Sequence, residues 1–184
     1  MTTLPHIVEW LEGDDALHLG RILVLLRAFA SRSGNHPIEG LTKLAKLDFL
    51  LRYPTYLERA LAAKAGNQHD KPNVEDYERN SVEAHMVRYR YGPWDHRYRR
   101  FLNTLAGLGL VHIDSEKRTI VIRLTDEGLK AAERLATDPS YETLAVRAAL
   151  LKKHFNIGPT NLMEFIYRTF PEVVSLNLGD KIAP

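Results

Sequence analysis

Ten consecutive residues, Tyr-Gly-Pro-Trp-Asp-His-Arg-Tyr-Arg-Arg at positions 91–100, combine residue types suited to binding an anion. They open a predicted helix, in which Pro93 fits the entering turn and Asp95 acts as the N-cap or as a first-turn carboxylate. Apolar residues recur at helical spacing and should face a core, namely Tyr98, Phe101, Leu102, Leu105 and Leu108. The opposite side carries His96, Arg97, Arg99, Arg100 and Asn103. This basic side is therefore a candidate contact surface for nucleic acid or a protein partner.

The positive charge of the chain is concentrated around this helix. Over 184 residues, 25 Lys and Arg nearly balance 23 Asp and Glu, and the net charge of +2 is far below that of a histone-like nonspecific binder. Between positions 85 and 100, Arg88 and Arg90 bring the number of arginines to five, against the single acid Asp95. This asymmetry indicates a defined anionic partner.

A β-hairpin is predicted directly after the helix. The strands Leu110–Ile113 and Thr119–Leu124 are separated by five polar residues, a connection of hairpin length. A helix followed by such a hairpin is the second half of a winged helix-turn-helix, in which the helix enters the major groove and the hairpin tip reaches phosphates. Lys117 and Arg118 at the tip would then contact DNA with the helix. The alternatives are that the basic face is only solvated surface, or that it binds protein.

The rest of the chain predicts a mainly α-helical protein. Helices are expected over 18–30, 38–51 and 55–65, with Lys43 and Lys46 on the polar side of the second. We assign residues 15–137 to the winged helix-turn-helix domain, with an inserted polar loop at about 66–84. The segment 85–91 would suit a short strand pairing with the wing. Thr125 should cap another helix, whose Leu129, Ala132 and Leu135 face inward.

Additional helices follow in a C-terminal extension, residues 138–174, before a tail, 175–184. Helices are predicted over 142–155 and 160–169. The apolar stripe of the last helix is a candidate protein interface, formed by Leu162, Phe165, Ile166 and Phe170. The alternative is that this stripe folds back onto the first helix as core.

Catalytic chemistry is not indicated, and we expect neither an enzyme nor a cofactor. The chain has no zinc-protease, P-loop, nucleophile-elbow or dinucleotide-binding motif. It has no cysteine, and its eight histidines lack chelating spacing, so no metal site is expected. Trp94 and Tyr98 are better assigned to core packing than to base stacking. No apolar run approaches a membrane span and no secretory signal is evident, so we expect a cytoplasmic protein without membrane contact.

Five segments, taken in order, resemble the small middle component of bacterial ABC three-component defence systems, the Lamassu-like group. They are Gly40–Pro54, Tyr89–Tyr98, Leu124–Gly128, Leu151–Phe155 and Phe165–Glu172, and the resemblance spans about residues 18 to 174. It implies a noncatalytic winged-helix subunit, encoded beside an SMC-like ABC ATPase and an effector that is often a nuclease. The polar loop after Gly66 has no counterpart in the resemblance.

The function expected from the sequence is that of an accessory subunit, which docks on the ATPase and assists the complex in sensing or binding double-stranded DNA. The alternative is a homodimeric winged-helix transcription regulator. A regulator should be a symmetric dimer with recognition helices spaced by one DNA turn, whereas a subunit should expose an asymmetric apolar patch.

Overall fold

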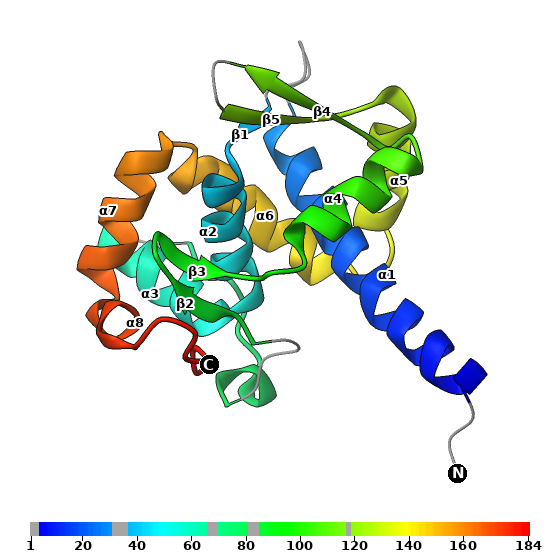
Figure 1. Ribbon diagram of the computed structural model, residues 1–184. Coiled ribbons are helices and arrows are strands. Elements are labelled where there is room, and N and C mark those ends of the chain that lie inside the picture. The colour runs from blue at the N-terminus through cyan, green and yellow to red at the C-terminus, as the bar shows by residue number, and fades with distance from the viewer. Residues whose placement is uncertain (1–3, 31–36, 66–69, 81–84, 117–118) are drawn as a thin grey trace.

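The computed structural model describes residues 4–30, 37–65, 70–80, 85–116 and 119–184, and within the first helix it describes side chains from Asp15 onward. The described chain is mainly helical with small antiparallel sheets (Figure 1). The elements are α1 (Leu4–Phe29), β1 (Ile38–Glu39), α2 (Leu41–Arg52), α3 (Pro54–Ala65), the 3-10 helix η2 (Asp76–Arg79), β2 (Val87–Tyr89), β3 (Gly92–Trp94), α4 (Tyr98–Gly107), β4 (Val111–Glu116), β5 (Thr119–Leu124), α5 (Asp126–Ala136), α6 (Glu142–Phe155), α7 (Pro159–Thr169) and α8 (Pro171–Ser175). None of these helices is long and apolar enough to cross a membrane.

The predicted hairpin is confirmed and belongs to a three-stranded sheet. β4 and β5 pair antiparallel from Val111 opposite Leu124 to Glu116 opposite Thr119. β1 adds to the other edge of β5, so that the strand order is β1-β5-β4. α4 directly precedes the β4–β5 hairpin in the chain and crosses in front of α1, with the hairpin above both (Figure 1).

The segment 85–91 does form a strand, but its predicted pairing with the wing is wrong. β2 pairs with β3 instead, with Tyr89 opposite Gly92 across a two-residue turn. Gly92 has a φ of 113°, a conformation that favours glycine, and this allows the chain to reverse there. Residues 92–94, expected to be a turn into the next helix, are therefore the second strand of a separate small hairpin.

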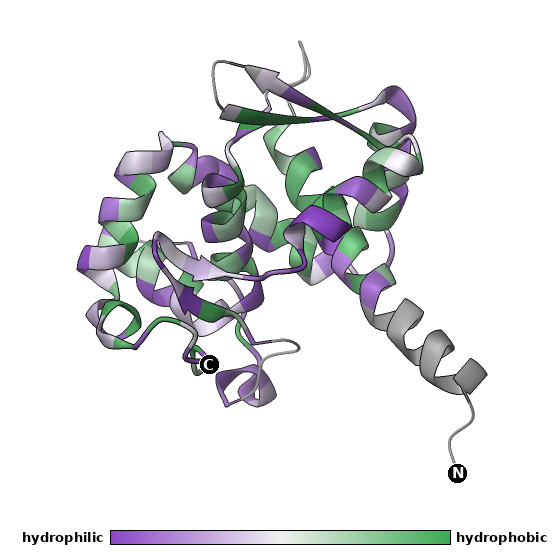
Figure 2. Cartoon of the chain, in the orientation of Figure 1, coloured by the Kyte–Doolittle hydropathy of each residue, from purple (hydrophilic) through white to green (hydrophobic). Residues whose placement is uncertain are grey.

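α2 is the central helix of the core. Every residue from Lys43 to Arg52 is buried, because α2 is enclosed by α1, α3, α6 and α7 and by β3 (Figure 2). The prediction that Lys43 and Lys46 lie on a solvated side is therefore wrong, and both amines lie in protein surroundings. Polar residues tolerate such positions only when they find partners or carry a function.

The C-terminal helices pack into the same core as the rest of the chain. Leu162, Phe165, Ile166 and Phe170 are between 0% and 7% exposed, so the stripe expected to bind a partner is core and the interface prediction is corrected. Phe170 lies edge-on to Tyr56, with ring centroids 4.9 Å apart, which ties the end of α7 to α3. A helix that packs onto its own domain needs the same apolar stripe as a helix that binds a partner, so the spacing of these four residues does not distinguish the two.

The segment 175–184, expected to be a tail, is also held in the fold. Ile182 is fully buried, and its backbone N–H donates to the carbonyl oxygen of Met86 at 2.9 Å. The hydroxyl of Tyr53 donates to the carbonyl oxygen of Ile182 at 3.1 Å and accepts the N–H of Met86 at 2.8 Å. The end of the chain is thereby attached to β2.

Two apolar residues expected to face the core are exposed. Leu108 is 63% exposed. The helix α4 ends at Gly107, so Leu108 does not continue the helical spacing that buries Leu105. Leu129 in α5 is 36% exposed, whereas Ala132 on the same helix is fully buried.

The start of α5 is fixed against the connection between α4 and β4. Thr125 caps the helix by accepting the N–H of Gly128 at 2.9 Å, and its hydroxyl donates to the carbonyl oxygen of Gly109 at 2.7 Å. A Cβ at Gly128 would overlap the carbonyl oxygen of Leu110. The close approach of α5 to the α4–β4 connection therefore requires glycine at this position.

We expect Gly128→Ala to destabilise the protein by on the order of 1–3 kcal/mol, because α5 must move away from the α4–β4 connection. Urea denaturation measures this loss. Gly107→Ala is the matched control: a Cβ there meets no atom within 4 Å, and alanine should raise the helix stability by roughly 0.5–1 kcal/mol. Equal stabilities of the two variants would contradict the close packing of α5.

Candidate nucleic-acid interface

A buried carboxylate fixes the position of α4. Asp48 of α2 is fully buried and accepts hydrogen bonds from Arg21 Nε at 2.7 Å and from Arg52 Nε at 2.9 Å. The hydroxyl of Tyr98, the first residue of α4, donates to the same carboxylate at 2.6 Å. One side chain therefore joins α1, α2 and α4 in the interior.

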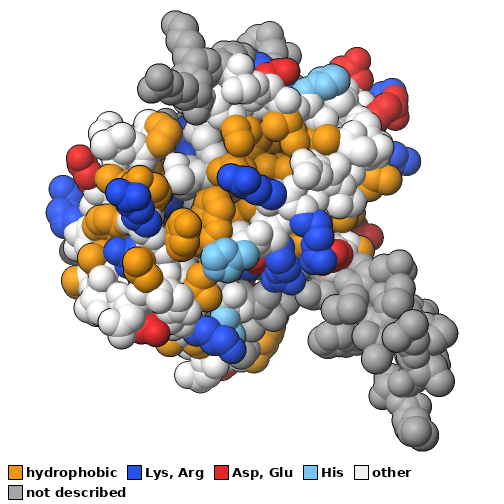
Figure 3. Space-filling model, viewed as in Figure 1, with side chains coloured by type: hydrophobic (Ala, Val, Ile, Leu, Met, Phe, Trp, Pro, Cys, Tyr) orange, Lys and Arg blue, Asp and Glu red, His pale blue; other side chains and the backbone are white. Residues whose placement is uncertain are grey.

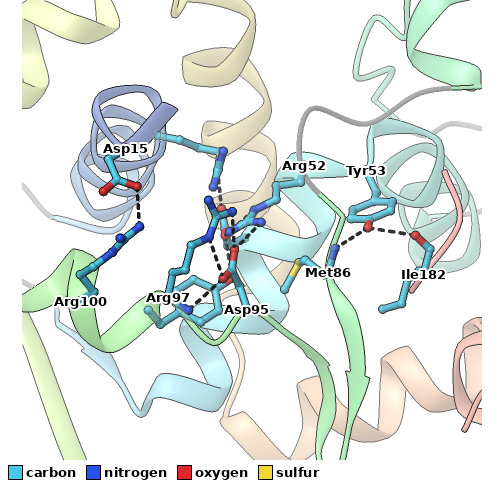
Figure 4. Close-up of polar contacts among 11 residues, drawn as sticks. Asp15, Arg52, Tyr53, Met86, Asp95, Arg97, Arg100 and Ile182 are labelled. Carbon is cyan, nitrogen blue, oxygen red and sulfur yellow. Dashed lines mark hydrogen bonds and ion pairs between the residues drawn. The ribbon is translucent and has the colours of Figure 1, made fainter. Parts of the chain in front are cut away.

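Asp95 extends this cluster to the segment before α4. Its carboxylate accepts Arg52 Nη1 at 2.8 Å, together with the backbone N–H of Arg97 at 2.9 Å and the Arg97 guanidinium at 3.1 Å (Figure 4). The N-cap residue of α4 is Arg97, so Asp95 does not cap the helix as predicted. It instead anchors the turn that leads into the helix.

The charges of this cluster stabilise its carboxylates. Burial alone would raise the pKa of Asp48, but the charges of Arg21 and Arg52 and the hydrogen bonds from Arg21 and Tyr98 hold it well below its usual value. Burial likewise opposes ionisation of Asp95, yet the hydrogen bonds from Arg97 and the charge of Arg52 lower its pKa to about 2. Both carboxylates are therefore ionised and paired near neutral pH.

The predicted contact residues divide into those that face solvent and those that do not. Arg97 is partly buried against Asp95, so it serves the cluster more than the surface. His96, Arg99 and Asn103 are exposed, as is Arg100, whose guanidinium pairs with Asp15 of α1 at 2.7 Å. We call His96, Arg99, Arg100 and Asn103 the α4 outer face. Figure 3 shows basic side chains gathered around this part of the molecule.

Arg88 and Arg90 do not join the α4 outer face. The guanidinium of Arg88 in β2 lies over the ring of Tyr167, at 5.5 Å from its centroid, and that of Arg90 lies over Tyr91 at the same distance. Lys117 and Arg118 at the hairpin tip lie outside the described residues.

The inserted segment is packed where the structure describes it. Within residues 70–80, Glu78 pairs with Arg147 of α6 at 2.6 Å, and that guanidinium also donates to the backbone carbonyls of Pro72 and Asn73. Arg147 is only 2% exposed, so it attaches this segment firmly to α6. Residues 66–69 and 81–84 of the predicted loop lie outside the described residues.

The aromatic residues beside α4 have mixed roles. Tyr98 is fully buried, and Trp94 packs against the core with its ring 5.5 Å from that of Tyr98, so the assignment of both to packing is confirmed. Trp94 also lines a cavity of about 270 Å³ together with Tyr89, Tyr91, Lys46 and Arg99. The sequence did not indicate this cavity, because Lys46 comes from α2, more than 40 residues away.

Among the described residues, no group of three or more His, Cys, Asp or Glu lies close enough to hold a metal ion. No protein-family model, curated protein or solved structure matches the chain.

We expect Asp95→Asn to lower the free energy of unfolding at pH 7 by about 2 kcal/mol. The fold holds the pKa of Asp95 at about 2, below its ordinary value, and the ionised carboxylate therefore stabilises the folded state by about this amount. Because the folded-state pKa is lowered, this stabilisation is present above the unfolded value near 4 and is lost as the pH falls toward 2. Urea denaturation of both proteins from pH 7 to pH 3 measures the effect. The difference should shrink steadily below pH 5, and a constant difference would contradict an ionised, paired Asp95.

Proposed function

We propose that the chain is a winged helix-turn-helix protein that contacts duplex DNA through the α4 outer face. The observation that carries this proposal is the position of α4. The helix directly precedes the β4–β5 hairpin, its apolar side is buried, and its solvent side presents two arginines and an asparagine. These residue types bind phosphates and base edges in the major groove.

The topology supports the winged-helix part of the proposal. β1 lies between α1 and α2 in the chain and pairs with β5, which gives the sheet order β1-β5-β4. In this assignment α2 and α4 are the two helices of the helix-turn-helix, with α2 as its buried helix and α4 as the recognition helix. The elements α3, η2, β2 and β3 then form an insertion between them, longer than the polar loop that the sequence predicted.

The role as a subunit is supported by the resemblance of the five sequence segments to the middle component of Lamassu-like systems. We accordingly propose a noncatalytic cytoplasmic subunit. It docks on an SMC-like ABC ATPase and assists DNA binding by the complex, in which the ATPase acts with an effector. The buried state of Leu162, Phe165, Ile166 and Phe170 moves the docking surface away from α7. Weak DNA binding by the isolated chain suits such a subunit, because the ATPase would supply further contacts.

The proposal is tested with the double variant Arg100→Glu and Asn103→Glu and a mixed-sequence DNA duplex. Both side chains are exposed. Arg100 pairs with Asp15 at the surface and lies over the Phe101 ring, contacts of small stabilising value, so the fold should be retained. We expect wild-type binding in the micromolar range with steep salt dependence, and at least tenfold weaker binding by the variant. Fluorescence anisotropy at several salt concentrations measures both.

The matched control is Arg168→Glu with Asn161→Glu, which makes the same two exchanges at exposed positions of α7. It should bind duplex DNA like the wild type. Equal loss in both variants would show that only net charge matters, and no loss in the α4 variant would show that its outer face is solvated surface. Nanomolar, sequence-selective binding by a homodimer would replace the subunit proposal with that of a transcription regulator.

A further inference from the structure

A groove lined by a buried lysine lies beside α4. One cavity of about 270 Å³ is bounded by the start of α2, the β2–β3 hairpin and Arg99 of α4. A second, of about 320 Å³, adjoins it toward the start of α7 and shares Thr42, Lys46 and Tyr91 with the first. Figure 3 shows apolar side chains gathered in this central region of the surface, with basic side chains among them. We call the two cavities together the Lys46 groove.

Lys46 is the residue that distinguishes the groove. It is 2% exposed and lines both cavities, and its Nζ donates to the carbonyl oxygen of Thr42 at 3.1 Å. In the part of the chain that the structure describes, no carboxylate forms an ion pair with this amine. Burial lowers the pKa of Lys46 to about 8, so the amine is still largely charged near neutral pH. A charge buried without a counter-ion is unfavourable, and an anionic ligand would compensate it.

Two helix starts add to the positive potential. The N-cap residues of α2 and α7 are Gly40 and Gly158, so neither helix has a side-chain cap for its first N–H groups. Leu41 and Thr42 from one start, and Pro159 and Thr160 from the other, line the groove. Helix N-termini attract anions, and the Lys46 amine reaches back to the first turn of α2. The groove therefore holds a buried cation and two positive helix ends.

The other wall of the groove is aromatic. The ring of Tyr89 is stacked on that of Trp94, with centroids 5.7 Å apart and planes 26° from parallel. Tyr91 lines both cavities and is 48% exposed, and the Arg90 guanidinium lies over its ring. Arg99 borders this wall. Flat aromatic rings beside cations are the surroundings in which nucleic-acid bases stack.

We propose that the Lys46 groove binds a nucleotide, with its phosphate at Lys46 between the starts of α2 and α7 and its base against Tyr91 and Trp94. The size of each cavity suits one nucleotide rather than a longer strand. The nucleotide can be free in solution or be the phosphorylated end of a single strand, since both present the same groups. This site goes beyond the proposed duplex contact, because Lys46 lies inside the groove and not on the α4 outer face.

Isothermal titration calorimetry of the full chain tests the proposal with three probes: deoxyadenosine monophosphate, deoxyadenosine, and a ten-residue deoxyadenosine strand with a 5′-phosphate. We expect saturable binding of the monophosphate, of the strand or of both, at least tenfold tighter than that of deoxyadenosine. Binding of the monophosphate identifies a free nucleotide as sufficient, whereas binding of the strand alone identifies a strand end.

Lys46→Met should weaken binding at least tenfold, while removal of a buried charge leaves the fold intact. Lys43→Met is the matched control, because Lys43 lies on the same helix and burial also lowers its pKa, but it does not line the groove. That variant should bind within twofold of the wild type. Tyr91→Ala, at an exposed position that the fold does not need, should weaken binding roughly tenfold through lost stacking.

The proposal is overturned if no phosphate-bearing probe binds saturably, if deoxyadenosine binds as tightly as its monophosphate, or if Lys46→Met binds like the wild type. None of these variants changes Arg100 or Asn103. Loss of nucleotide binding with intact duplex binding, or the reverse, therefore separates this proposal from the proposed function.

Discussion

The ion-paired carboxylate of Asp48 is the interaction on which the arrangement of the helices depends. Two arginines, Arg21 and Arg52, approach it from α1 and α2, and the Tyr98 hydroxyl approaches it from α4. Arg52 also pairs with Asp95, so a chain of ion pairs runs through the interior and ends at the partly exposed Arg97. Removing one member would leave a buried charge unpaired, which is far more costly than losing a surface pair. The direction in which α4 presents its outer face follows from this cluster, because Tyr98 and Asp95 fix the first turn of the helix.

Local patterns were sufficient to predict most of the helices and the β4–β5 hairpin, because periodicity and turn residues are properties of neighbouring positions. The partners of Asp48 on other helices were not predictable in this way. Arg52 is only four positions away, but Arg21 and Tyr98 lie 27 and 50 positions away in the chain, and helical periodicity cannot show which distant side chain meets a buried acid. For the same reason the sequence predicts Lys43 and Lys46 on the polar side of α2: their spacing is that of surface lysines, and only the surrounding elements bury them.

The two sides of α4 could be predicted from its sequence, but the contacts of its basic residues could not. The division of α4 into a buried and a basic side follows from its sequence, and Phe101, Leu102 and Leu105 are indeed buried. The sequence of α4 does not show which of its basic residues are free to bind a ligand. Arg97 turns inward to pair with Asp95, and Arg100 pairs with Asp15 of α1. The α7 stripe shows the converse ambiguity. An apolar face demands burial, but its sequence does not say whether the chain itself or a partner supplies the cover.

The two kinds of buried charge in this protein have different physical meanings. In the Asp48 cluster the buried charges are ion-paired and joined by hydrogen bonds, so the cluster is explained by structure alone. Lys46 is just as inaccessible, yet its described contact is a neutral carbonyl oxygen, and it lies near the positive ends of α2 and α7. Charge without compensation destabilises a fold, so its presence beside an open aromatic groove is better explained by a ligand than by packing. Arg99 borders that groove and also belongs to the α4 outer face, so the two proposed binding surfaces meet at this residue.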